Sequence, residues 1–376
     1  MIKPHDLAKY LRRGLQRPVE PCEVTDDFRH FVVIPVMDEL EELPHTLASL
    51  AVALPKAAEK TGVILVVNHA PDAPLVRKAA NLETLARLRE CDPSLPGGMT
   101  AGENLFWIDA ASPGREIGRG VGEARRIGLD SALARLVRPD TGLLYSLDAD
   151  SPLSPDYFVK IPAFFNAHPE YGALSLAVRH RPGKTAAEEE AIRRYEVYMA
   201  DYVEKLRRAG SPYAFHTIGS AIAVRSEAYV RCGGMRVRQG AEDFYFLQAL
   251  RKVTLVGEFP EPLVYPAARP SDRVPFGTGP AIRSQLAGEA LPTYPETGFA
   301  ELAALLNAAT DEALRRPEAF IAALSPYARN FLEAGGFLAM WPELLANTPR
   351  RAGAAREAFD RWFDALKTLQ FIRNAK

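Results

Sequence analysis

Two aspartates separated by one residue end an apolar run at residues 143–150. Side chains alternate along a strand, so Asp148 and Asp150 are predicted to leave its end on the same side. Paired carboxylates suit Mg²⁺ or Mn²⁺, which often take a substrate's phosphates as further ligands. The alternative is a plain turn, continued by Ser151-Pro152 and Ser154-Pro155. Asp-x-Asp alone is a weak motif, so its neighbours must decide between the two interpretations.

Strand-like and helix-like patterns alternate from residue 31 to about residue 180, and these elements would position the aspartates. The expected strands span residues 31–36, 63–67, 104–109, 143–148, 172–178, 221–224 and 254–256, and the expected helices 39–54, 75–91, 122–137, 155–167 and 185–208. Such alternation predicts a mainly parallel, doubly wound α/β sheet covered by helices. Ligands of these sheets bind beyond the carboxyl ends of strands, where Asn68, Asp109 and Asp148 fall.

The last third of the chain has a different pattern. Residues 260–295 are rich in proline and glycine with almost no periodicity, which marks a functional or mobile segment. Beyond residue 297 the pattern is purely helical. We therefore expect an N-terminal helical arm at residues 1–30, an α/β domain at 31–270, and a lid loop with an all-α C-terminal subdomain at 271–376.

Composition bounds the function classes. The 376 residues carry 46 basic and 47 acidic side chains, a net charge of −1, so no global field favours nucleic acid or an anionic membrane. Three widely spaced cysteines argue against a disulfide framework or a zinc site. Residues 1–21 are charged and lack a signal-peptide core, and no run approaches the roughly 18 apolar residues of a spanning helix. The expected location is cytoplasmic, with peripheral membrane contact left open.

Four segments with recognisable motifs follow one another along the chain. They are residues 33–39 followed by leucines to residue 50, the Gly-x-Gly-x-Ala-Arg-Arg-Ile-Gly stretch at 120–128, the aspartate pair with residues 151–157, and residues 219–244. The series, over roughly residues 31–266, resembles family 2 glycosyltransferases. That resemblance implies the GT-A fold, a mixed sheet flanked by helices, and a nucleotide-diphospho-sugar donor.

The resemblance implies roles for the donor half of a site. Asp150 would be the ligand of a Mn²⁺ or Mg²⁺ ion, and Asp148 would contact the donor ribose or a metal-bound water. Such an ion would neutralise charge on the leaving pyrophosphate. Arg125 would reach the nucleotide's base or phosphates as a fixed planar cation. The alternative for Arg125 is a solvated helix face within an Arg-Arg pair.

Two further positions belong to this half by resemblance. Asn68 stands where these enzymes usually carry an aspartate that binds the base, and an amide can still bind a base edge. The departure leaves the base open, and an Asx turn before Pro71 is the alternative. Glu39 would lie beside the nucleotide, or else serve as an acid in a helix's first turn, where the dipole favours it.

Asp243 is the expected catalytic base. Inverting transfer needs a group to take the acceptor's hydroxyl proton as the anomeric carbon is attacked. The family's acidic pair, here Glu242-Asp243, opens a helix after a glycine-rich loop, and its aspartate usually plays that part. Helix capping is the alternative, and both roles can coexist.

The late histidine that many metal-dependent GT-A enzymes add as a ligand is missing, since all seven histidines fall at or before His216. Residues 269–279 stand there instead, with Arg273 expected to bind the donor as part of a lid and Asp272 an optional metal ligand. The alternative is a proline-stiffened linker.

The sequence therefore predicts metal-dependent, inverting sugar transfer to an acceptor hydroxyl on a sugar, glycan or small molecule. A nucleotidyltransferase is the enzymatic alternative, but residues 35–39 lack its glycine-rich signature and lysine. A non-catalytic nucleotide-sugar-binding protein is the other, and retention of both the aspartate pair and Asp243 argues against it. No readable motif identifies the sugar, the base or the acceptor.

Overall fold

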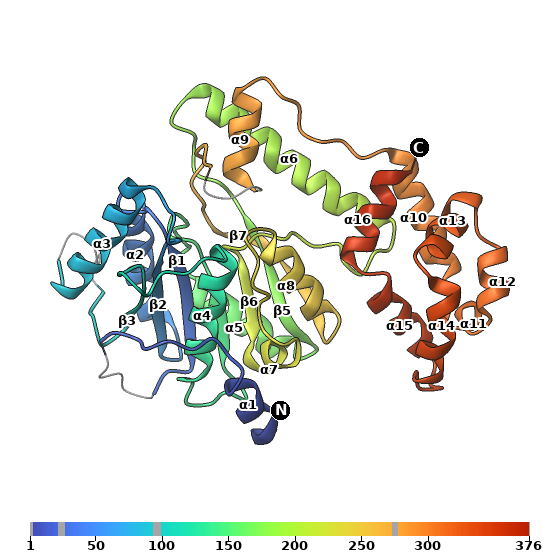
Figure 1. The fold of residues 1–376 in the computed structure, drawn as a ribbon, viewed down its shortest axis with the longest axis horizontal. Helices are drawn as coiled ribbons and strands as arrows, with labels where there is room; N and C mark the ends of the chain where they lie inside the picture. The colour runs from blue at the N-terminus through green and yellow to red at the C-terminus, as the bar shows by residue number, and fades with distance from the viewer. Residues whose placement is uncertain (1–2, 22–26, 93–98, 273–276, 376) are drawn as a thin grey trace. The chain divides into compact units, whose positions relative to one another are not determined.

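The computed structural model describes residues 3–21, 27–92, 99–272 and 277–375, and within these ranges seven strands form one mixed sheet (Figure 1). The strands are β1 (His30–Val36), β2 (Thr61–Asn68), β3 (Leu105–Ala110), β4 (Leu143–Ser146), β5 (Tyr171–Val178), β6 (Ile222–Arg225) and β7 (Leu255–Val264), in the order β3-β2-β1-β4-β6-β5-β7. Strand β6 runs antiparallel to both its neighbours, whereas the other pairs are parallel. The carboxyl ends of the parallel strands therefore meet at one edge, together with the amino end of β6.

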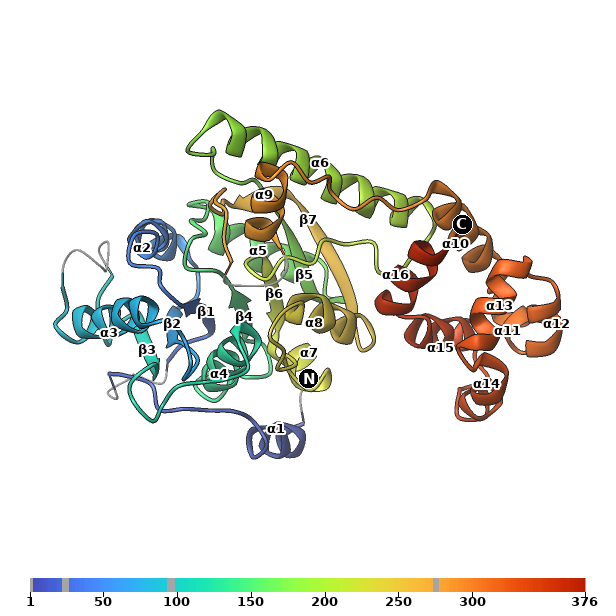
Figure 2. The same ribbon diagram turned by 45° about the horizontal axis from the view of Figure 1, so that its top comes forward.

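Helices cover both faces of the sheet, as Figure 2 shows. The covering helices include α2 (Leu43–Ala53), α3 (Leu75–Arg89), α4 (Val121–Leu133), α5 (Tyr157–Ala167), α7 (Ser226–Arg231) and α8 (Glu242–Arg251). Ile34 packs in one apolar cluster with Leu47 of α2. The next residue back, Val33, faces the other way, where a Cβ on Gly128 of α4 would lie 2.3 Å from it. Burial on both faces explains the continuous apolar runs in the sequence.

The chain divides into two compact units, Met1–Glu196 with His216–Glu289, and Val197–Phe215 with Ala290–Lys376. The second unit is helical and contains α10 (Glu296–Ala308), α11 (Asp311–Leu314), α12 (Pro317–Ala322), α13 (Pro326–Ala334), α14 (Phe337–Ala346), α15 (Ala354–Trp362) and α16 (Ala365–Asn374). Its core includes Trp341, which stacks on Phe337 with ring centroids 5.0 Å apart. Within the described residues, no helix is both long enough and apolar enough to cross a membrane.

The α/β architecture expected from the sequence, a mixed sheet flanked by helices with C-terminal helices, is confirmed. Several elements differ in extent from the expectation. Strand β4 ends at Ser146, so Asp148 and Asp150 lie in the turn after it and not at the end of the strand. Strand β7 runs on to Val264 in spite of Pro260 and Pro262, which an edge strand tolerates because its outer side needs no ladder donors. Helix α9 (Thr278–Leu286) lies in the stretch expected to lack regular structure, and α2 begins only at Leu43, with Pro44 in its first turn.

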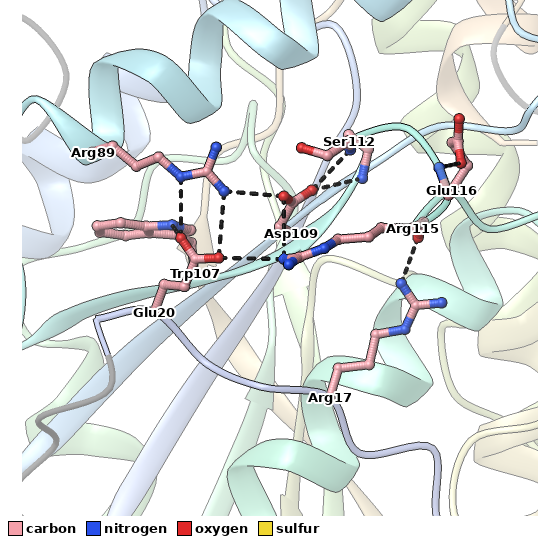
Figure 3. Close-up of polar contacts among 10 residues, drawn as sticks. Arg17, Glu20, Arg89, Trp107, Asp109, Ser112, Arg115 and Glu116 are labelled. Atoms are coloured by element: carbon pink, nitrogen blue, oxygen red, sulfur yellow. Dashed lines mark hydrogen bonds and ion pairs between the residues drawn. The ribbon is translucent and has the colours of Figure 1, made fainter.

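The segment after α1 (Pro4–Leu11) runs along the open edge of β3. Glu20 and Trp107 exchange two backbone hydrogen bonds of 2.8 Å, which adds a bridge to the outer strand. The carboxylates of Glu20 and Asp109 lie between the guanidinium groups of Arg89 and Arg115 (Figure 3). An unpaired edge is a site for aggregation, so this network both ties down the arm and covers the sheet.

Asp109 should make the protein's stability depend on pH in the acidic range. Burial opposes its charge, but hydrogen bonds from Ser112, Ala111 and Arg89 outweigh it and lower the pKa of Asp109 from 3.8 to about 2. Its contribution is therefore complete above pH 3.8 and is lost as pH falls towards 2. Asp109→Asn should lower the free energy of unfolding by about 2 kcal/mol at pH 7 in urea titrations, and by far less near pH 2. Asp140→Asn, which removes only the local pair with Arg138, is the control, and an equal loss there would contradict the prediction.

Candidate functional site

The site predicted from sequence lies where the strand order reverses. The chain passes from β1 to β2 and β3 on one side, while β4 and the later strands lie on the other. Ligands of open α/β sheets bind beyond the carboxyl ends of strands at such a switch point. Glu39 follows β1 there, and Asp148 and Asp150 follow β4.

Arg125 of α4 is buried at the centre of this region, with a side chain only 4% exposed. Its Nη2 donates to Asp148 Oδ1 at 2.6 Å and its Nε to Glu242 Oε1 at 3.2 Å. Nη1 donates to Ser146 Oγ at 2.7 Å and to the carbonyl of Gly219 at 2.8 Å. All three nitrogens are thus bonded to protein, and the solvated helix face considered for this residue is wrong. Arg125 joins the end of β4 to the start of α8.

Gly219 makes this arrangement sterically feasible. A Cβ at that position would lie 2.5 Å from Nη2 of Arg125 and 2.9 Å from its Cζ. The guanidinium is held at four points and cannot yield without losing hydrogen bonds. Position 219, in the loop before β6, therefore requires glycine.

Gly219→Ala should displace Arg125 and weaken its bonds to Asp148 and Glu242. We expect a loss of about 1–3 kcal/mol in the free energy of unfolding, measured in urea, and a larger proportional loss of turnover. Gly118→Ala is the matched control, because a Cβ there meets nothing within 4 Å. If both variants behave alike, the close packing of Gly219 on Arg125 has no consequence.

Asp243 lies in the first turn of α8, where its Oδ1 accepts the backbone N–H of Phe244 at 2.7 Å. Burial and the adjacent Glu242 raise the pKa of Asp243 from 3.8 to about 7, against the opposing effect of Arg125. Burial and the charge of Asp243 raise the pKa of Tyr195, on α6 (Ala186–Arg208), to about 12. Asp243 thus combines a bond to the helix backbone with the proton affinity that a base near neutral pH needs.

Arg269, which follows β7, bridges the ends of β1 and β4. Its Nη2 lies 2.6 Å from both carboxylate oxygens of Glu39 and 3.1 Å from Asp150 Oδ2. The backbone of Asp150 accepts from the N–H of Ala267 at 3.0 Å and from Arg181 at 3.3 Å, so the segment after β7 is bonded to the aspartate loop. The sequence interpretation placed a donor-binding arginine in this segment but chose Arg273.

The other expected residues are placed as follows. Asn68 is 4% exposed, and its Nδ2 donates to the carbonyls of Val36 and Val66, which ties β2 to the end of β1. Asn81 donates to the Asn68 carbonyl and accepts the N–H of Asp38, a role that no pattern in the sequence indicated. The exposed Asp272 pairs with Arg77 at 2.7 Å. Arg273 lies outside the described residues.

The excess of carboxylates in this region favours binding of a divalent cation, but the protein side chains alone do not complete a metal site. Glu39, Glu42, Asp148, Asp150, Glu242 and Asp243 gather here with Arg125, Arg181 and Arg269, so carboxylates outnumber guanidinium groups among the described side chains. Carboxylate oxygens are the ligands that Mg²⁺ and Mn²⁺ prefer. No set of three His, Cys, Asp or Glu residues in the described ranges is arranged to hold a metal. An ion held by Asp150 and Asp148 would need oxygen ligands from a bound molecule.

No protein-family model matches this sequence, and no curated protein does. Solved structures with similar folds include S. aureus TarS 1–349, with 14% identity, a TM-score of 0.44 and coverage of 89% of each chain. TarS 1–349 in complex with UDP gives 13% identity and a TM-score of 0.43, again over 89% of each chain. The mannosyltransferase PcManGT from Pyrobaculum calidifontis, solved with GDP-Man and Mn²⁺, gives 18% identity and a TM-score of 0.41 over 97% of this chain and 94% of that one.

Proposed function

We propose that this protein transfers a sugar from a nucleotide-diphospho-sugar to an acceptor hydroxyl with inversion at the anomeric carbon. The observation that carries the proposal is the position of Asp243 in the first turn of α8, next to Glu242, which Arg125 joins to Asp148 after β4. Burial and Glu242 raise the pKa of Asp243 to about 7. A base of that pKa beside a switch-point site is suited to deprotonating a hydroxyl at neutral pH.

The donor's diphosphate is proposed to lie beyond β1 and β4, near Glu39, Asp150 and Arg269. Asp150 and Asp148 would hold a Mn²⁺ or Mg²⁺ ion, which when bound would neutralise charge on the leaving diphosphate. Asn68 and Glu39 are also proposed to belong to the donor site. Arg125 has all its nitrogens bonded to protein, so its proposed part is to position the acidic groups rather than to grip the nucleotide.

The proposed step is a single displacement. The acceptor oxygen forms a bond to the anomeric carbon as the bond from that carbon to the diphosphate oxygen breaks, and the acceptor's proton passes to the Asp243 carboxylate. Glu242, which accepts from Arg125 Nε, raises the pKa of Asp243 and so tunes this proton transfer. Glu242 is therefore a positioning residue in this proposal, and Asp243 is the base.

Thermal stabilisation by nucleotides tests the proposal. A panel of UDP, GDP, ADP, CDP and dTDP with Mn²⁺ or Mg²⁺ should contain at least one that raises Tm, since a ligand at about 100 times its Kd adds about 2.7 kcal/mol. The matching monophosphate should stabilise less, and Asp150→Asn should lose the effect while the exposed-site control Asp156→Asn keeps it. Failure of every diphosphate with both metals would reject the proposed donor site.

A further inference from the structure

Arg269 lies between Glu39 and Asp150, and Asp150 is one of the two proposed ligands of the metal ion. Its single nitrogen Nη2 has three carboxylate oxygens of Glu39 and Asp150 within 3.1 Å. The Glu39 and Asp150 side chains are only 7% and 18% exposed, so their oxygens have little room for another cation while the arginine is there. The positive charge of the Arg269 guanidinium therefore already neutralises these carboxylates.

A divalent ion would compete with Arg269 for Asp150 Oδ2. Nη2 lies 3.1 Å from Asp150 Oδ2, and a Mg²⁺ ion bound to the same oxygen would lie at about 2.0–2.1 Å from it. An ion at that distance would stand beside the guanidinium, and two cations repel strongly in a poorly solvated site. Metal binding at Asp150 therefore requires Arg269 to move.

A diphosphate is the ligand that would make the move favourable. Arginine binds phosphate oxygens through paired hydrogen bonds, so a diphosphate can replace the carboxylates as its partner. The buried Nε of Arg269 has no hydrogen-bond partner among the described residues, so the present arrangement leaves one of its donors unsatisfied. Exchange of partners would satisfy that donor and release the carboxylates together.

We propose that Arg269 closes Asp150 and Glu39 to divalent cations until a nucleoside diphosphate arrives, and that it then transfers its hydrogen bonds to the diphosphate. Metal and donor consequently bind together, each increasing the affinity for the other. The nucleotide part rests on the proposed function, whereas the competition between Arg269 and a metal ion does not.

Mn²⁺ binding followed by electron paramagnetic resonance tests the competition on the full chain without nucleotide. Arg269→Gln should bind Mn²⁺ about 10- to 100-fold more tightly than the wild type, the range expected for losing hydrogen bonds to charged groups. Arg315→Gln is the matched control, since Arg315 is 29% exposed and pairs with Asp311, against 25% exposure for Arg269. Arg269→Lys, which keeps the charge but not the paired donors, should lie between wild type and Arg269→Gln.

The second arm adds the diphosphate that stabilises the wild type most. It should raise wild-type Mn²⁺ affinity at least about tenfold and that of Arg269→Gln much less, because the competitor is already gone. Equal Mn²⁺ affinity of wild type and Arg269→Gln in the first arm would overturn the inference even if nucleotides bind. If no diphosphate binds at all, the proposed donor site fails, while tighter Mn²⁺ binding by Arg269→Gln would still support the competition.

Discussion

Asp243→Asn is expected to lower kcat by about 10²- to 10⁴-fold, the usual contribution of a general base, with little change in donor binding. Asparagine keeps the size of the side chain and can still accept the N–H of Phe244, so helix α8 should form normally. The exposed first-turn acid Glu318 supplies the control, since Glu318→Gln alters a comparable helix position away from the site.

The pH dependence should identify the same group. Because the base must be ionised, wild-type kcat/KM should rise with pH and level off above about 7, the pKa to which burial and Glu242 raise Asp243. The residual activity of Asp243→Asn should lack this inflection. An unchanged inflection in the variant would assign the titration to another group and reject Asp243 as the base.

Asp243→Asn should increase stability at alkaline pH although it lowers activity. The pKa of Asp243 is higher in the folded protein than its ordinary value of 3.8, so its contribution is favourable below pH 3.8 and is lost as pH rises through about 7. Asp243→Asn should therefore have a higher Tm than the wild type at pH 8 and little advantage at pH 4. A lower Tm at pH 8 would show that the carboxylate is not destabilising in the folded protein.

Arg125→Met is expected to cause the largest loss of stability, about 3–5 kcal/mol at pH 7.5, because it leaves the buried Glu242 and the part-exposed Asp148 without their partner. The loss should shrink at pH 5, where Asp243, whose pKa is raised to about 7, is more fully protonated. Urea titrations at the two pH values measure this difference. Arg138→Met, at a side chain 57% exposed, should change stability by less than about 1 kcal/mol.

Arg125 should also affect the proposed base. Its charge lowers the pKa of Asp243, so removing it should raise that pKa further and shift the pH profile of any remaining activity upward. Arg125→Lys keeps the charge but cannot reproduce bonds from three nitrogens in one plane, so it should recover the pH profile better than the stability. A variant with wild-type stability and pH profile would contradict the central position assigned to Arg125.

The strands of the sheet could be predicted because burial on both faces forces continuous apolar runs, as in β1 and β2. Strand β7 was underestimated because its two prolines are acceptable only at an edge, and the strand order is not written in the local sequence. Helix α9 was missed because its first residues are glycine, threonine and proline, which favour turns when they are considered alone.

The site was predictable where chemistry lies in a short motif and unpredictable where it depends on distant contacts. Asp148 and Asp150 follow the same strand, so their place beyond β4 was predictable, although β4 ends at Ser146 and both lie in the turn after it rather than in the strand. Arg269 meets Glu39 across 230 positions of sequence, and Arg125 meets Gly219 across 94. Only the fold decides whether such an arginine is solvated or buried among carboxylates, which is why the sequence alone suggests a nucleotide role for Arg125 and singles out Arg273 rather than Arg269 in the lid.

Hydrogen–deuterium exchange of the full chain, with Mn²⁺ and the diphosphate that stabilises it most, tests the central claim most directly. The donor site proposed here predicts protection of the backbone amides at residues 37–42, 147–152 and 265–272, the segments that hold Glu39, Asp150 and Arg269. The same complex of Asp150→Asn should lose that protection. Protection confined to other parts of the chain, or none despite saturation, would contradict a donor site at the ends of β1 and β4.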